Sequence, residues 1–262
     1  MIKYNDKLVA IDHFPDGTIL MKENAALGQK AEIIWHFENN EELVVLYYLV
    51  RHLQNKGITD IFLKLPYIPN ARQDRVKQQE DVFTLKYFSM MINELNFKSV
   101  TVLDPHSYVS EALIDHICIE TPGKYVEKVL KQIGNEVIFF YPDEGAMKRY
   151  SAMFNKPYVF GIKKRDWETG EILGLSVSGQ TELIKDSTIL IVDDICSRGG
   201  TFYYSAKALK DWGAKDIYLY VSHCENTVLE GELIKSDFIK RIYTTNSIYT
   251  KENEKVEVFE YE

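Results

Sequence analysis

Two adjacent carboxylates followed by a glycine-rich turn form the segment of this sequence best suited to chemistry. Residues 189–201 read ILIVDDICSRGGT, so an apolar run typical of a buried strand ends at Asp193 and Asp194. These carboxylates can accept hydrogen bonds from neighbouring sugar hydroxyls. Gly199 and Gly200 let the backbone approach a ligand closely, and a helical pattern follows them. The segment predicts a sugar-phosphate site at a strand end, with an ordinary acid-capped strand-to-helix turn as the alternative.

The turn itself supplies the groups that a phosphate needs. Backbone N–H groups over residues 197–201 come at the start of the expected helix, where they can donate to an anion. The residues assigned to the sugar phosphate are Asp193, Asp194, Ser197, Arg198, Gly199, Gly200 and Thr201.

Two basic segments could bind a nucleotide and its phosphates. Residues 72–75 read RQDR and follow an apolar run with two prolines. A guanidinium can stack on a purine while it donates to phosphate, although a solvated helix start would also fit. Residues 163–165 read KKR and precede the polar stretch DWETGE at 166–171, which is typical of a loop or hairpin. Three cations there could stabilise charge on a transferring polyphosphate, or could simply be solvated.

Strand-like and helix-like runs alternate along the chain. The first half gives AEIIWHF, a helical run over residues 40–57, DIFLKLPYI, a second helical run over 83–97, and SVTVLD. The second half gives EVIFFYPD, MKRYSAMF, PYVFGIKKR, TILIVDD, a long helix and DIYLYVSH. This order predicts two α/β halves with mainly parallel sheets. The TPG at residues 121–123 interrupts it, so we expect domains at residues 1–121 and 122–262.

Composition narrows the class of protein. A length of 262 residues with 45% hydrophobic residues suits one large or two modest globular domains. The formal net charge of -8 argues against nucleic-acid binding. Three cysteines, without metal-ligand spacing, favour reduced thiols. No apolar run is long enough to cross a membrane. We therefore expect a cytoplasmic protein without membrane or nucleic-acid partners.

The sugar-phosphate segment resembles the phosphoribosyl-pyrophosphate (PRPP) loop of type I phosphoribosyltransferases and of ribose-phosphate pyrophosphokinases, also called PRPP synthetases. The segment PYIPNARQDR at residues 66–75 resembles the ATP-binding segment of the pyrophosphokinases, which simple phosphoribosyltransferases lack. Further similar motifs follow in order: FPDGT at 14–18, DPHS at 104–107, PDEGAMKR at 142–149, KKR at 163–165 and TNSI at 245–248. The resemblance implies two tandem phosphoribosyltransferase-like domains, the first binding ATP and the second ribose 5-phosphate, with the active site between them.

The resemblance also implies roles in nucleotide binding. Arg72 would stack on adenine, Gln73 and Asp74 would contact the nucleotide, and Arg75 would reach the polyphosphate. Phe14 would form the other adenine wall from a neighbouring subunit, which requires a homo-oligomer of two or more chains. For Phe14, packing in the hydrophobic core is the alternative.

Metal and catalytic roles are implied in the same way. His106 and Asp143 would contact Mg²⁺, each after a strand of its own half; a hydrogen-bonded structural histidine is the alternative for His106. Lys163 and Arg165 would be the catalytic pair, whereas Lys164 stands where arginine is more usual.

The implied activity is transfer of the β,γ-diphosphoryl group of Mg-ATP to O1 of ribose 5-phosphate, which gives PRPP and AMP. Ser197 and Arg198 replace an acidic residue and a threonine of the family pattern, which removes a carboxylate and adds a cation beside the sugar phosphate. Glu80 replaces a basic residue, so allosteric regulation is not implied for this chain. Two alternatives stay open: a catalytically weak, regulatory homologue, and a phosphoribosyltransferase that consumes PRPP.

Overall fold

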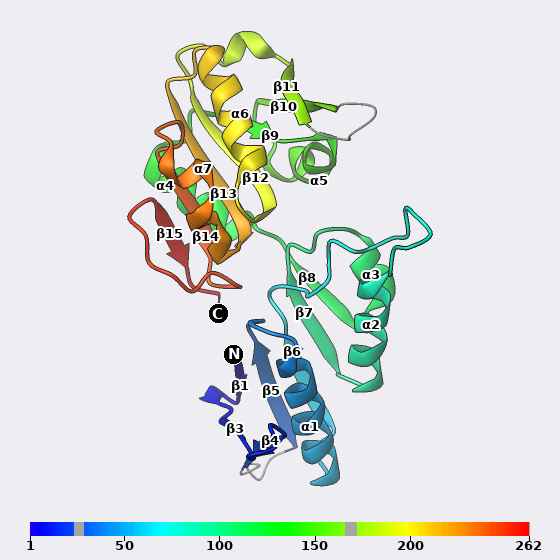
Figure 1. The fold of residues 1–262 in the computed structure, drawn as a ribbon. Helices are drawn as coiled ribbons and strands as arrows, with labels where there is room; N and C mark the ends of the chain where they lie inside the picture. Colours follow the sequence, from blue (N-terminus) through cyan, green and yellow to red (C-terminus); the bar gives the residue numbers. More distant parts are fainter. Residues whose placement is uncertain (24–28, 166–171, 262) are drawn as a thin grey trace. The chain divides into compact units, whose positions relative to one another are not determined.

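The computed structural model describes residues 1–23, 29–165 and 172–261, with side chains omitted at 163–165 and 172–175. The chain forms two compact units, Met1–Thr121 and Pro122–Glu262 (Figure 1). No helix in the described ranges is both long and apolar enough to cross a membrane. Each unit has a sheet, its own helices and its own hydrophobic core, and is described by itself below.

The N-terminal unit contains a six-stranded sheet in the order β2-β1-β5-β6-β7-β8, in which β5 to β8 are parallel. The sheet strands are β1 (Ile2–Tyr4), β2 (Lys7–Leu8), β5 (Lys30–Trp35), β6 (Asp60–Lys64), β7 (Ser99–Leu103) and β8 (Ile117–Glu120), and β3 (Ile11–His13) and β4 (Ile19–Met21) form a separate hairpin. The helices are α1 (Glu41–Asn55), α2 (Thr84–Glu94) and α3 (Val109–Leu113).

Helices cover one face of this sheet. Figure 1 shows α1, α2 and α3 on the same side of β5 to β8. Burial accordingly alternates along β6, where Ile61 and Leu63 are buried and their neighbours are not. Trp35 and Phe88 lie in the core between sheet and helices. The expected strand DIFLKLPYI is shorter than predicted, because it ends at Lys64, before Pro66, whose nitrogen cannot donate to a sheet.

The C-terminal unit contains a seven-stranded sheet in the order β11-β10-β9-β12-β13-β14-β15, parallel except for β11. Its strands are β9 (Val137–Tyr141), β10 (Tyr158–Arg165), β11 (Ile172–Gly179), β12 (Thr188–Cys196), β13 (Asp216–Cys224), β14 (Arg241–Thr245) and β15 (Val256–Phe259). Its helices are α4 (Gly123–Ile133), α5 (Glu144–Phe154), η1 (Thr181–Leu183), α6 (Gly200–Asp211), η2 (Asn226–Glu230) and α7 (Glu232–Lys235).

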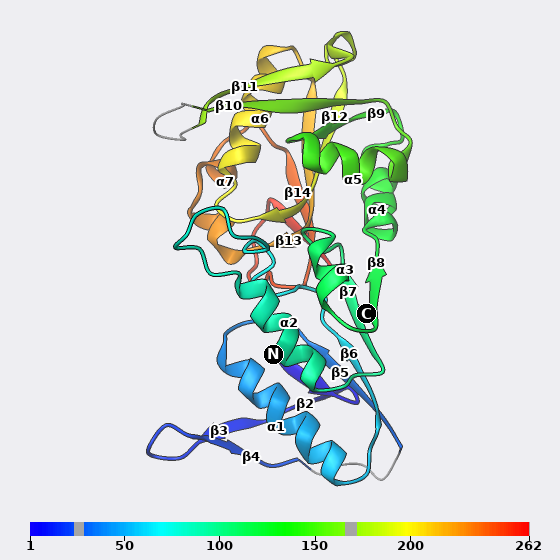
Figure 2. The same cartoon turned by 90° about the vertical axis from the view of Figure 1, so that its right-hand side faces the viewer.

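Helices cover both faces of the second sheet. Figure 2 shows α6 and α7 on one face and α4 and α5 on the other. The central strands β12 and β13 are therefore buried almost continuously, in contrast to the alternation along β6. This explains the unbroken apolar run ILIV that leads to Asp193, because both faces of its strand meet core. Both units thus have the expected architecture of mainly parallel sheets flanked by helices.

Candidate active site

The turn after β12 has the geometry of an anion site. Residues 197–199 connect the strand to α6, and Gly199 has a φ of 77°, a left-handed conformation that favours glycine. The first N–H groups of α6, at Gly200 and Thr201, begin a helix and so have no acceptor within it. The structure thus brings the carboxylates and the glycine turn together at one end of the sheet.

The two aspartates differ in their surroundings. Asp194 is buried, and its Oδ1 lies 3.3 Å from Nη1 of Arg149 on α5. Asp193 is half-buried and accepts a hydrogen bond from the backbone N–H of Asp194 at 3.0 Å. Burial, followed by the negative charges of Asp194 and Asp143, raises the pKa of Asp193 well above its usual range. This corner of the unit therefore carries an excess of negative charge.

Asp143 lies beside this pair at the end of β9. It is the N-cap of α5, and its side chain accepts a hydrogen bond from the backbone N–H of Ala146 at 3.1 Å. Its influence on the pKa of Asp193 shows that the two carboxylates interact. Among the described residues, no three His, Cys, Asp or Glu side chains gather as a metal cage.

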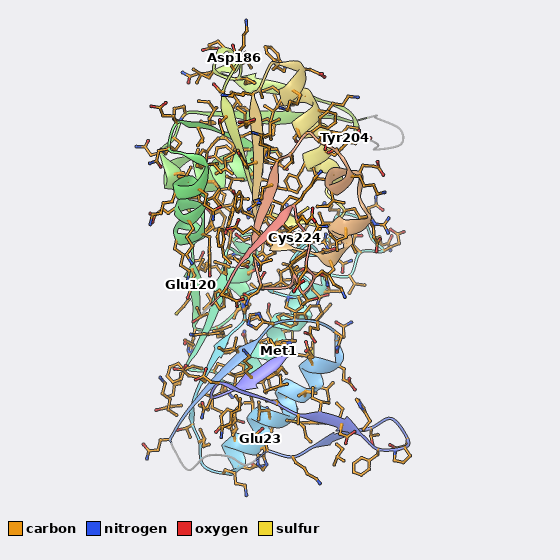
Figure 3. The ribbon with its side chains drawn as sticks, turned by 90° about the vertical axis from the view of Figure 1, so that its left-hand side faces the viewer. Met1, Glu23, Glu120, Asp186, Tyr204 and Cys224 are labelled. Carbon is orange, nitrogen blue, oxygen red and sulfur yellow. The ribbon has the colours of Figure 1, made fainter. Side chains whose placement is uncertain are left out.

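Two cysteines lie at the ends of β12 and β13, where the glycine turn begins. Cys196 at the end of β12 pairs in register with Cys224 at the end of β13, and both are buried free thiols (Figure 3 labels Cys224). A hydrogen bond with Cys224, together with burial, raises the pKa of Cys196. Since the thiolate is the reactive form, this environment makes Cys196 a poor nucleophile.

The RQDR segment of the N-terminal unit forms a compact charged cluster. Asp74 is buried and accepts two hydrogen bonds from Arg75, from Nε at 2.7 Å and from Nη2 at 2.8 Å. The hydrogen bonds and the positive charge of Arg75, with a smaller influence of His106, lower the pKa of Asp74 to about 2. The structure thus joins RQDR to the DPHS motif, which contains His106 and Ser107, within one unit.

The other nucleotide candidates lie at the surface. Arg72 and Gln73 are exposed, and the Gln73 side chain accepts a hydrogen bond from Thr84 Oγ1 at 2.7 Å. Phe14 lies in the turn between β3 and β4 and is 50% exposed, so packing in the core of its own unit is excluded. An exposed aromatic ring at a hairpin tip is available to a ligand or a neighbouring chain.

The structure describes the basic pair of the second half by backbone alone. Lys163 and Arg165 lie in β10, which pairs with β11 in an antiparallel hairpin. The side chains of both residues, and the predicted loop at 166–171, lie outside the described residues. Their places relative to Asp193 therefore stay predictions.

Two further motifs meet near the site strand. His223 at the end of β13 is buried, and its Nδ1 lies 2.8 Å from Ser247 Oγ in TNSI. Thr245 Oγ1 donates to the backbone carbonyl of Ser222 at 2.7 Å. These bonds fasten the ends of β13 and β14 together, next to the strand that carries Asp193.

Comparison with known proteins agrees with this arrangement. A family model described as phosphoribosyl transferase domain matches residues 146–258, which include Asp193 and the glycine turn. The ribose-phosphate pyrophosphokinase of Bacillus subtilis is 28% identical over 264 residues, covering 95% of this chain and 80% of its relative. Ribose-phosphate pyrophosphokinase 2 of Enterococcus faecalis is 26% identical over 261 residues, covering 94% of this chain and 78% of that protein.

The fold comparison covers both units as well. The crystal structure of phosphoribosylpyrophosphate synthetase from Mycobacterium smegmatis aligns with 97% of this chain and 86% of that chain, with a TM-score of 0.80 and 17% identity. The chain is thus similar over nearly its whole length to ribose-phosphate pyrophosphokinases, and it shares the fold of the synthetase structure. This similarity extends over both units, whereas the phosphoribosyl transferase domain model matches residues of the C-terminal unit only.

Three residues near the family's sugar-phosphate motif were not predicted. Arg149 pairs with Asp194, although the sequence placed it only at the end of PDEGAMKR. Glu230 pairs with Arg198, and a side chain at Gly231 would collide with the Arg198 carbonyl. A helical spacing from the Asp143 cap could have pointed to Arg149, because positions 143, 146 and 149 follow one another at three-residue intervals. Nothing local in the sequence pointed to Glu230 or Gly231.

Proposed function

We propose that this protein is a ribose-phosphate pyrophosphokinase that transfers the β,γ-diphosphoryl group of ATP to O1 of ribose 5-phosphate. The supporting observation is that similarity to proteins named for this activity extends over 94% to 95% of the chain, and so includes both units. In this reaction O1 attacks the β-phosphorus, the bond from that phosphorus to the α,β-bridging oxygen breaks, and AMP leaves. The products are PRPP and AMP.

The C-terminal unit would hold the sugar phosphate. Asp193 and Asp194 accept hydrogen bonds from the ribose hydroxyls. The amides of residues 197–201 donate to the 5-phosphate, with Arg198 as an added cation. These contacts fix O1 in position, which accelerates a bimolecular reaction chiefly by orienting the two reactants.

The N-terminal unit would hold ATP. Arg72 stacks on the adenine, Gln73 and Asp74 contact the nucleotide, and Arg75 reaches the polyphosphate. In the structure Asp74 is fully engaged by Arg75, so its contribution is to orient that guanidinium. The exposed Phe14 supplies the second adenine wall from a neighbouring chain, which makes the active protein a homo-oligomer.

Mg²⁺ belongs to this proposal, with Asp143 of the C-terminal unit and His106 of the N-terminal unit as its candidate ligands. The observation that supports a metal here is that the negative charge of Asp143 raises the pKa of Asp193. A divalent cation would offset the negative charge of these two carboxylates. When bound, Mg²⁺ supplies charge neutralisation for the pyrophosphoryl oxygens. Lys163 and Arg165 act on the same oxygens, and this proposal assigns no dedicated base. A cytoplasmic location belongs to the same proposal and agrees with the three free cysteines.

The test is AMP release in the presence of magnesium, ATP and ribose 5-phosphate. We expect release that requires ribose 5-phosphate, and we expect Lys163→Ala to lower it by about two orders of magnitude, as for loss of one transition-state donor. Lys207→Ala is the matched control, because it removes an exposed lysine of the same unit that has no role in the proposal.

The outcomes separate the alternatives. Release without any need for ribose 5-phosphate, or none at all, would contradict the proposed activity and favour a regulatory homologue. Pyrophosphate release with PRPP and a nucleobase would favour a phosphoribosyltransferase. Equal rates for wild type and Lys163→Ala would contradict the role given to that lysine alone.

A further inference from the structure

The phosphate turn is braced by a segment about thirty residues downstream. The backbone N–H of Glu225 donates to the carbonyl of Cys196 at 2.8 Å, at the start of the turn. At its end, a Cβ on Gly199 would lie 2.6 Å from Cδ2 of Leu233. The segment 225–233, hereafter the brace, therefore touches the turn on both sides of Arg198.

Gly231 is the tightest point of this contact. A Cβ at Gly231 would lie 1.8 Å from the carbonyl oxygen of Arg198 and 2.9 Å from its carbonyl carbon. The φ of Gly231 is -82°, which any residue can adopt, so its backbone conformation does not require glycine. Glycine is needed at this position because only a residue without Cβ lets the brace lie against the Arg198 backbone.

Glu230 then places a carboxylate on the Arg198 side chain. Arg198 Nη2 lies 3.3 Å from Glu230 Oε2, and the two side chains are 74% and 62% exposed. An ion pair as exposed as this is weak and exchanges easily. A phosphate dianion can accept two charge-assisted hydrogen bonds from one guanidinium, so it is a stronger partner than this carboxylate.

We propose that Glu230 is a positioning residue that competes with the sugar phosphate for Arg198, while Gly231 fixes the backbone from which Arg198 extends. This inference rests on the proposed function. Arg198 pairs with Glu230 until a phosphate dianion displaces the carboxylate. A sugar without phosphate cannot displace it, so the exchange favours phosphorylated sugars over neutral ones. The ligand class of this device is a pentose carrying a terminal phosphate.

Binding of ribose 5-phosphate, measured by isothermal titration calorimetry on the full chain, tests the competition. We expect Glu230→Gln to tighten binding about two- to fivefold, the range for loss of an exposed ion pair. The Michaelis constant for ribose 5-phosphate should fall by a similar factor while kcat is unchanged. Ribose without phosphate should bind both proteins equally.

Glu232→Gln is the matched control. It removes the same charge two residues away, from a carboxylate that pairs with Lys235 at 3.1 Å instead of with Arg198. We expect a markedly smaller change in affinity. In an Arg198→Ala background, Glu230→Gln should not change the affinity for ribose 5-phosphate, because the guanidinium with which Glu230 pairs is absent. Gly231→Ala should weaken binding at least tenfold by displacing the Arg198 backbone.

Each outcome bears on one of the two proposals. If wild type binds no ribose 5-phosphate, the proposed function itself fails. If wild type binds and Glu230→Gln matches it, or matches Glu232→Gln, the competition is overturned while the proposed function stands. An equal gain from Glu230→Gln with and without Arg198 would likewise overturn it, and none of these results depends on how well Gly231→Ala folds.

Discussion

Each unit places an aspartate near its candidate binding residues, and the surroundings shift the pKa of these two aspartates in opposite directions. In the N-terminal unit Asp74 accepts hydrogen bonds from two nitrogens of the Arg75 guanidinium, which lower the pKa of Asp74 to about 2. In the C-terminal unit Asp193 lies near Asp194 and Asp143, which raise its pKa together with burial. In the first site an arginine offsets the charge of the carboxylate, whereas the second site brings three carboxylates together and Arg149 pairs with one of them.

This difference indicates that Asp74 has mainly a structural role and that Asp193 has mainly a role in binding. A satisfied carboxylate fixes the geometry of its neighbours and contributes to stability at neutral pH. A carboxylate crowded by like charges costs stability and persists where function requires it. We therefore expect changes at Asp74 to act mainly on stability and changes at Asp193 mainly on activity.

Asp193→Asn gives the largest expected effect. Ribose-5-phosphate-dependent AMP release should fall at least about 100-fold, because one of the two carboxylates proposed to position the ribose is lost. Thermal stability should rise by about 2–4 °C, the shift for roughly 1 kcal/mol in a chain of this size, because the crowded charge is removed. Asp74→Asn is the comparison variant and should lower the melting temperature. If Asp193→Asn lowered the melting temperature as Asp74→Asn does, the proposed difference between the two aspartates would be wrong.

The two arginine partners offer the next test. Arg149→Met removes the partner of buried Asp194, and breaking a buried ion pair costs about 3–5 kcal/mol. Arg75→Met removes a guanidinium that is 60% exposed, for which about 1 kcal/mol is expected. Urea denaturation of both variants measures the free energy of unfolding directly. If the two variants lost similar free energies of unfolding, the pairs Arg149–Asp194 and Arg75–Asp74 would differ less than the exposure of their arginines indicates.

The sequence predicted the strand and turn of the second site because their signals are local. ILIV reads as a strand covered on both faces, and two glycines after two aspartates mark a turn that must approach a ligand. The regular alternation of β5 to β7 with α1 and α2 was predicted for the same reason. Motif order then gave the resemblance to ribose-phosphate pyrophosphokinases, and the comparisons confirm that similarity.

Other features had no local signal. The short strands β1 to β4 and β8 were not predicted, since two to four residues give too little periodicity. Helix α4 was also missed, because lysines alternate with its buried face of Tyr125, Val126, Val129 and Leu130. The brace at 225–233 could not be predicted either, because its contact with Arg198 joins residues far apart in sequence. The bidentate Arg75–Asp74 pair depends on rotamers, so the sequence assigned Arg75 to the polyphosphate alone.

The pH dependence of the unfolding free energy gives the smallest expected effect, and it tests the difference between Asp74 and Asp193 most directly. Asp74 has a depressed pKa, so its contribution to stability is fully present above about pH 4 and is lost as the pH falls towards about 2. Asp193 has the opposite sign: its charge costs stability at higher pH, and protonation relieves that cost as the pH falls. Unfolding free energies measured between pH 2 and pH 5 should therefore fall less steeply in Asp74→Asn than in wild type. They should fall more steeply in Asp193→Asn, because the relief is lost with the carboxylate. If both variants followed the wild-type slope, neither aspartate would carry the charge state that its neighbours impose in the folded protein.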